Sequence, residues 1–263
     1  MAATRPAVAT LPRGDRMFIS TCLAVITIIA WLYLLHLDRQ MSSSVEHDRM
    51  MAEMGMTMNA PWTAADVWFT FAMWAVMMVA MMAGAAAPVF LLFAAMQKGR
   101  AATGWRPTAL LFGLGYVAIW VAFSAAAALA QWALHQMALL SPAMAASSPY
   151  LAGSILLVAG AYQLSPWKGA CLTQCRSPLG FVMANWRDGR LGALRMGVRH
   201  GIYCLGCCWA LMGLLFVVGV MNLVWVAALT GLVLLEKIGP AGIIVARVTG
   251  AAMLIGGLIL IVG

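Results

Sequence analysis

Charge is the scarcest property of this chain: charged residues make up 9% of its 263 residues, and only eight of them are acidic. Soluble domains carry about 25% charged residues, whereas 64% of this chain is hydrophobic and its mean hydropathy is +0.92. The composition excludes a soluble globular domain and predicts an integral membrane protein. In such a protein the net charge of +8 reports on loop topology, and we expect no nucleic-acid partner.

Sequence motifs of ATP-driven transport and of nucleophilic catalysis are also missing. The sequence contains no glycine-rich phosphate loop, no ATPase motif and no nucleophile–base pair. We therefore expect neither an ATP-driven pump nor an enzyme. Cysteine is scarce, at six residues, and no spacing among the six matches a standard zinc finger.

Long apolar segments predict an all-α polytopic transmembrane helical bundle. They cover residues 17–37, 62–93, 108–134, 150–164, 200–219, 222–236 and 241–262. A single helix over 200–237 would be about 55 Å long, far beyond the ~30 Å hydrocarbon core, so we expect a break at 219–222. The bundle then has six or seven spans in one transmembrane domain, 17–263. Pro88 is expected to kink or end the second span.

Basic residues predict the orientation. Twelve of the 16 Lys and Arg lie in residues 1–16, 97–107 and 165–199, which share one side if the first four spans alternate. The positive-inside rule makes that side cytoplasmic. We expect a multi-pass protein of the bacterial cell inner membrane with a cytoplasmic N-terminal tail at 1–16. The segment 165–199 is then cytoplasmic, and the polar loop 38–61 is periplasmic.

Soft ligands recur at helical spacing in the fifth apolar segment. Side chains four residues apart stack on one face of a helix. This face carries His200, Cys204, Cys208 and Met212, with Cys207 beside it, and Cys171 and Cys175 precede it. Imidazole, thiolate and thioether are ligands that Cu(I) prefers, while four thiolates would suit zinc. We expect the two cysteine groups to meet near the cytoplasmic face.

The cysteines have an alternative interpretation as small residues at a tight helix contact. Against it, five of them cluster, and a reducing cytoplasm keeps thiols free. The nearby Lys168, Arg176 and Arg199 are expected to lower the thiol pKa values and favour the metal-binding thiolate.

Methionine is abundant, with 21 residues. The loop 38–61 holds His47 and six methionines, including the run Met54, Met56 and Met58. Exposed thioethers there favour copper capture, although an amphipathic helix lying on the bilayer is the alternative. Farther along, Met73, Met77 and Met81 lie on one face of the second span. They form either a thioether track across the membrane or ordinary helix packing.

Several motifs together resemble one bacterial family. They are the methionine run at 73–82, the segment 160–178 with its two cysteines, the Tyr-Cys-Leu-Gly-Cys-Cys-Trp motif at 203–209, the run 215–222 and the Glu-Lys pair at 236–237. The chain is similar to integral membrane proteins described as metal-binding and sometimes labelled copper chaperones. The resemblance implies a membrane protein that handles a metal ion.

Three functions remain open at this point. In the first, the protein is non-catalytic: the outer methionine loop captures Cu(I), and the inner cysteine cluster holds or delivers it. Its partners are the lipid bilayer, the metal ion and a periplasmic or cytoplasmic copper protein. In the second, the protein is a quinone-linked thiol–disulfide oxidoreductase, although the outer loops lack cysteine. In the third, it is an assembly scaffold for a copper enzyme.

Overall fold

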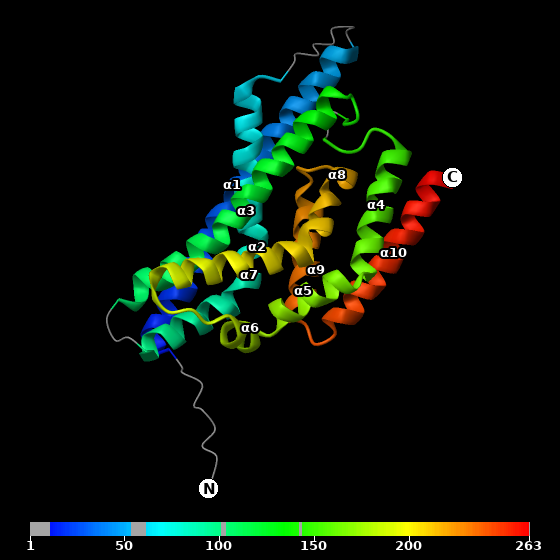
Figure 1. The fold of residues 1–263 in the computed structure, drawn as a ribbon. Helices are drawn as coiled ribbons and strands as arrows, with labels where there is room; N and C mark the ends of the chain where they lie inside the picture. The colour runs from blue at the N-terminus through cyan, green and yellow to red at the C-terminus, as the bar shows by residue number, and fades with distance from the viewer. Residues whose placement is uncertain (1–10, 54–61, 101–103, 142–143, 263) are drawn as a thin grey trace.

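Helices make up the architecture. The computed structural model describes residues 11–53, 62–100, 104–141 and 144–262, and in these ranges its named elements are all helices. They are α1 (Arg13–Glu53), α2 (Ala64–Arg100), α3 (Trp105–Gln136), α4 (Pro149–Leu164), α5 (Pro166–Arg176), α6 (Pro178–Asn185), α7 (Gly189–Gly213), α8 (Leu215–Val218), α9 (Leu223–Ile238) and α10 (Gly242–Val262). The predicted all-α class is confirmed. Helices α1 to α3 form one side of the bundle, α4 and α10 form the other, and α9 lies between them (Figure 1).

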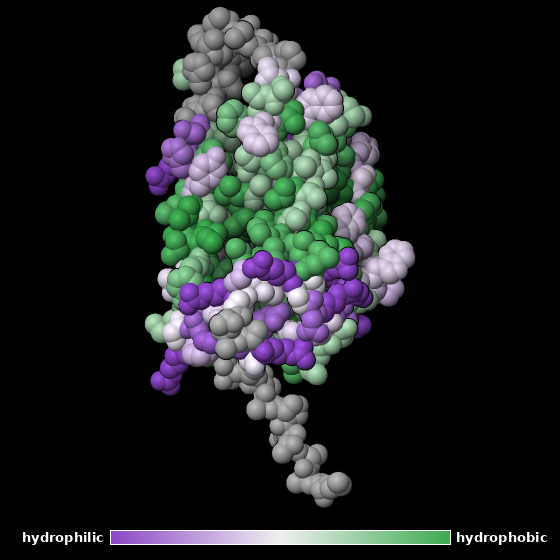
Figure 2. All heavy atoms as spheres, turned by 60° about the vertical axis from the view of Figure 1, so that its left-hand side comes forward, coloured by the Kyte–Doolittle hydropathy of each residue, from purple (hydrophilic) through white to green (hydrophobic). Residues whose placement is uncertain are grey.

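Five stretches of the described residues are long and apolar enough to cross a membrane. They are Arg13–Met41, Ala64–Arg100, Trp105–Gln136, Gly189–Val218 and Gly242–Val262, and α4 is a shorter apolar helix. Their outer faces expose large apolar side chains, such as Leu32 on α1 and Ile259 on α10. On the face that Figure 2 shows, hydrophobic residues form a band across the middle of the molecule. Such a surface suits contact with lipid rather than with water.

Two helices are longer than the sequence predicted. Residues 38–53 were expected to begin a polar loop, but α1 continues to Glu53, because no Pro or Gly interrupts that stretch. Helix α2 likewise runs through Pro88 to Arg100, so the proline does not end it. Met54, Met56 and Met58 lie outside the described residues, and for His47 only the helical backbone is described.

The predicted break at 219–222 is confirmed. Helix α8 ends at Val218 and α9 begins at Leu223. Gly219 has a φ of 98°, a conformation that a side chain would disfavour. Asn222 caps α9 by accepting a hydrogen bond from the backbone of Trp225. The chain therefore reverses here, and α9 returns toward the end from which α7 started (Figure 1).

Helices α3 and α7 touch through their backbones. A Cβ atom at Gly197 would lie 2.0 Å from the Phe112 carbonyl oxygen, and one at Gly201 would lie 2.9 Å from Ile119. Small residues at Gly197 and Gly201 thus allow the two helices to pack closely. The close approach places the middle of α7 against Tyr116 of α3.

One end of the bundle is charged. Asp15 at the start of α1 pairs with Lys98 at the end of α2 and, at 3.6 Å, with Arg106 at the start of α3. Arg100 pairs with Asp188 beside α7 at 3.3 Å. Hydrophilic side chains form a belt at this end, below the hydrophobic band (Figure 2). The start of α1 and the end of α10 lie at opposite ends of the bundle (Figure 1).

Candidate metal centre

Thiols from two helices meet inside the bundle. Cys175 on α5 and Cys207 on α7 bring their Sγ atoms to 3.8 Å, and Cys207 lies 3.5 Å from Cys208. A disulfide bond is near 2.05 Å, and all six cysteines are free. The predicted meeting of the two cysteine groups is confirmed for Cys175. Cys204, Cys207 and Cys208 are each 1% exposed.

Helix α5 docks on α7 at a glycine. Ser165 caps α5, and Pro166 is its first residue. A Cβ atom at Gly206 would lie 2.8 Å from the Cys171 Sγ atom, and the Tyr162 hydroxyl donates to the Gly206 carbonyl. Cys171 therefore packs against the α7 backbone, on the more exposed side of the cluster. Burial raises the pKa of Cys171.

The pairwise spacing of the thiols is that of metal ligands. Two sulfurs bound to one tetrahedral zinc at 2.3 Å lie about 3.8 Å apart. Within the described residues, however, no group of three or more His, Cys, Asp or Glu side chains is arranged to hold a metal. The thiols touch in pairs rather than around one point, and the Cys207 thiol faces the Cys204 carbonyl at 3.1 Å. A bound ion therefore needs a rotation of Cys207 or a ligand of another type.

The cations expected beside the thiols have other partners, so that prediction is wrong. Arg176 donates to the carbonyl of Glu236, which belongs to the last turn of α9, and to that of Pro240 just beyond the helix. Lys168 forms an ion pair with the Glu236 carboxylate. Arg199 lies over the Tyr203 ring, at the outer side of α7.

The hydrogen bonding of Cys175 also runs against the expected shift. Interaction with the Cys204 sulfur, together with burial, raises the pKa of Cys175 well above its ordinary value, although the Cys207 thiol donates to Cys175. A neighbouring acceptor favours the protonated form of a thiol.

Lys237 is the cation that reaches the thiols. Its Nζ atom lies 2.9 Å from the Cys204 Sγ atom and 3.9 Å from the Met82 Sδ atom. The Tyr116 hydroxyl lies 3.1 Å from the same Cys204 sulfur. Cys204 therefore receives polar contacts from both α3 and α9. We call Cys204, Met82, Tyr116 and Lys237 the sulfur pocket.

A buried polar network adjoins the sulfur pocket. The Lys168 ammonium and the Glu236 carboxylate lie 2.6 Å apart, and each side chain is 1% exposed. Gln163 donates to Glu236 and accepts from Lys168, and it also donates to Thr249. Gln163 is buried. The network links α4, α5, α9 and α10 around the end of α9.

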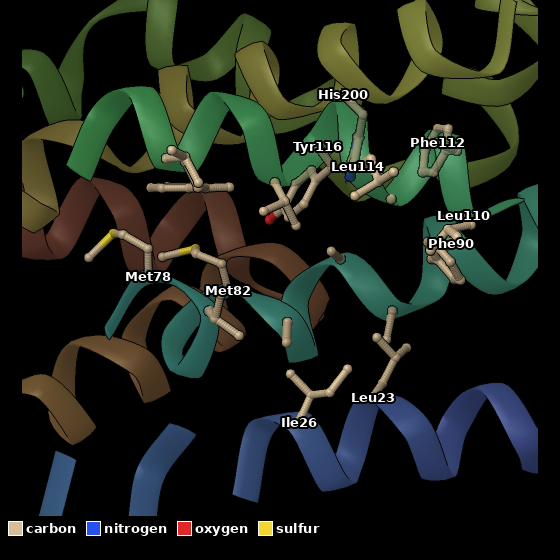
Figure 3. Close-up of a pocket in the computed structure, with 18 of the residues that line it drawn as sticks. Leu23, Ile26, Met78, Met82, Phe90, Leu110, Phe112, Leu114, Tyr116 and His200 are labelled. Carbon is tan, nitrogen blue, oxygen red and sulfur yellow. The ribbon is translucent and has the colours of Figure 1, made fainter. Parts of the chain in front are cut away.

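The methionines of α2 are buried in the same core as the cysteines. The five residues Met73, Met77, Met78, Met81 and Met82 all belong to it, as does Met212. Met78 and Met82 line a cavity of about 240 Å³ together with Tyr116 and His200 (Figure 3). Met82 is linked to Cys204 through the Lys237 ammonium, and it does not belong to the predicted face of Met73, Met77 and Met81.

His200 lies among aromatic rings. Its ring centroid is 5.5 Å from that of Tyr116 and 4.9 Å from that of Phe181, and Figure 3 shows it pointing toward Tyr116. Its buried Nδ1 atom has no hydrogen-bond partner among the residues that the structure describes. The structure thus places this predicted ligand against Tyr116. The Tyr116 hydroxyl, in turn, contacts the Cys204 sulfur.

Sequence reasoning missed Lys237, Tyr116 and Met82 as neighbours of the thiols. One signal was present for Lys237, because a charged residue in an apolar segment faces protein and marks a functional site by default. The contacts of Tyr116 and Met82 depend on how α2, α3 and α7 pack, and periodicity does not specify that.

A family model described as copper chaperone matches residues 71–260, most of the chain. The chain belongs to the copper chaperone family. The matched region includes every cysteine of the cluster and the whole sulfur pocket, which agrees with the resemblance seen in the sequence motifs. No curated protein and no solved structure matches the chain.

Proposed function

We propose that this copper chaperone family member is a membrane protein that binds Cu(I) through its cysteine cluster and delivers it to another copper protein. The observation that carries the proposal is the convergence of Cys175 and Cys207, from separate helices, at a ligand-like 3.8 Å. Thiolate and thioether ligands favour Cu(I) over harder ions. The Met82 thioether contacts the same Lys237 ammonium as Cys204 does, and it would supply a further soft ligand.

Copper capture by the outer segment is part of the proposal. Met54, Met56 and Met58, with His47, are its expected ligands at the far end of α1. Copper would then pass along the methionines of α2 toward the thiols. Zinc remains the competing ion, since four thiolates also suit it.

Copper binding by the reduced protein tests the proposal. The full chain, purified in detergent without oxygen, should bind Cu(I), and the double variant Cys175→Ser, Cys207→Ser should lose most of it because serine is a poor ligand for a soft ion. Bound copper is measured by metal analysis after gel filtration. Cys22→Ser is the matched control, since Cys22 lies exposed on α1, and it should bind as the wild type does. Equal copper in the double variant would reject the site.

The same experiment separates the alternative function. A quinone-linked oxidoreductase would cycle between the free thiols and a Cys175–Cys207 disulfide, and would bind little copper in its reduced form. Mass spectrometry of the protein isolated with membrane quinones would then show the disulfide.

We further propose seven membrane crossings, with α4 and α9 as short spans. Each has 16 residues, about 24 Å of helix, somewhat less than a ~30 Å core. Seven crossings agree with the opposite positions of the start of α1 and the end of α10 (Figure 1). The charged end of the bundle then faces the cytoplasm of a bacterial cell and α10 ends outside it.

Reporter fusions test this topology. A reporter placed after Glu53 and another placed after Val262 should both read periplasmic, while one at the N-terminus should read cytoplasmic. A cytoplasmic signal after Val262 alone would indicate six crossings. A cytoplasmic signal after Glu53 would invert the orientation.

A further inference from the structure

Lys237 is a buried cation without a carboxylate partner. Lys237 is only 5% exposed, and none of the ion pairs among the described residues includes it. The neighbouring Glu236 is bound by Lys168. An ammonium in an apolar interior requires a compensating negative charge. The Cys204 sulfur, at 2.9 Å, is the group that the structure positions against this ammonium.

The ammonium of Lys237 has the neighbours that a copper ion would have. It contacts the Cys204 sulfur and lies 3.9 Å from the Met82 thioether, and thiolate and thioether are both Cu(I) ligands. An ion bound to Cys204 from this side would overlap with the ammonium. The Lys237 ammonium and a metal ion therefore cannot occupy the position next to the Cys204 sulfur at the same time.

We propose that Lys237 is a tethered competitor of the copper ion, which fills the sulfur pocket in the metal-free protein and returns to it as copper leaves. This inference rests on the proposed Cu(I) function. Because both cations are monovalent, their exchange leaves the charge next to Cys204 unchanged. A divalent ion would leave an extra buried positive charge, so the same exchange discriminates against zinc.

The surroundings of the sulfur pocket give the exchange room. The cavity that Met82 and Tyr116 line adjoins it (Figure 3), so the Met82 side chain has free volume into which it can turn. Lys237 lies one residue before the end of α9. Its flexible four-carbon stem can carry the ammonium past the helix end when copper enters.

Copper release tests the inference. A tethered group acts at an effective concentration of about millimolar, whereas other cations must first enter the apolar core. In Lys237→Gln, transfer of bound Cu(I) to an excess of a soluble Cu(I) chelator should therefore be about tenfold slower than in the wild type. Lys237→Met should show the same slowing without a polar side chain. Lys237→Arg retains a cation and should transfer copper at close to the wild-type rate.

The outcomes separate the two proposals. If the wild type binds no Cu(I), the proposed function fails and the inference falls with it. If the wild type binds Cu(I) but Lys237→Gln and Lys237→Met release it as fast or faster, only the inference is overturned.

Discussion

Replacement of Glu236 by leucine should lower the free energy of unfolding by about 3–5 kcal/mol, because it leaves the Lys168 ammonium buried and unpaired. Both side chains are 1% exposed and lie 2.6 Å apart. Gln163 cannot replace the carboxylate as the partner of Lys168, since its amide carries no charge and already donates a hydrogen bond to Thr249. Thermal unfolding in detergent, followed by circular dichroism, measures the loss.

The double variant Glu236→Leu, Lys168→Met should recover much of that stability. It removes both charges together, and replacing a whole buried pair by apolar residues is often neutral. Asp188→Ala is the surface control: its pair with Arg100 is exposed, and removing it should change little. The single variant Lys168→Met completes the comparison. If the loss of unfolding free energy in the double variant equals the sum of the losses in Glu236→Leu and Lys168→Met, the charges do not interact as the structure indicates.

Gly197→Ala should cost about 3 kcal/mol or more, at the upper end of overpacking. The added Cβ would stand 2.0 Å from the Phe112 carbonyl oxygen, and since that atom is backbone, α3 and α7 must move apart. The separation would also withdraw Tyr116 from Cys204, so copper binding should weaken as well. Unfolding in detergent and metal analysis measure the two effects.

Gly231→Ala provides the matched control. A Cβ atom there would meet nothing within 4 Å, and alanine favours a helix over glycine, so stability should stay level or rise by about 0.5–1 kcal/mol. Equal losses in the two variants would mean that the contact between α3 and α7 is not as close as described.

Hydropathy and glycine positions predicted most of the fold. The apolar segments indicated an all-α protein, and the length of the 200–237 run required the break that Gly219 makes. The extension of α1 to Glu53 was missed because polarity was taken as the mark of a loop. A helix that leaves the apolar layer keeps its backbone hydrogen bonds, and no residue in 38–53 breaks them.

The candidate site was predicted in its sulfur atoms but not in its charges. The four-residue spacing of Cys171 and Cys175, and the density of cysteines at 204–208, indicated a shared location, which Cys175 and Cys207 confirm. The basic residues nearest in sequence, such as Arg176, were assigned to the thiols, yet Lys237 from α9 is the one that reaches them. Such long-range pairings depend on which helices are neighbours, and a single sequence does not specify that.

The end of α9 has a consequence for how this protein can vary. Glu236 and Lys237 are adjacent but reach different helices, Lys168 on α5 and Cys204 on α7. One residue inserted or deleted between Asn222 and Glu236 would rotate both side chains by about 100° and abolish both contacts at once. A substitution between the cap and Glu236 leaves this register intact, whereas a change in the length of α9 does not.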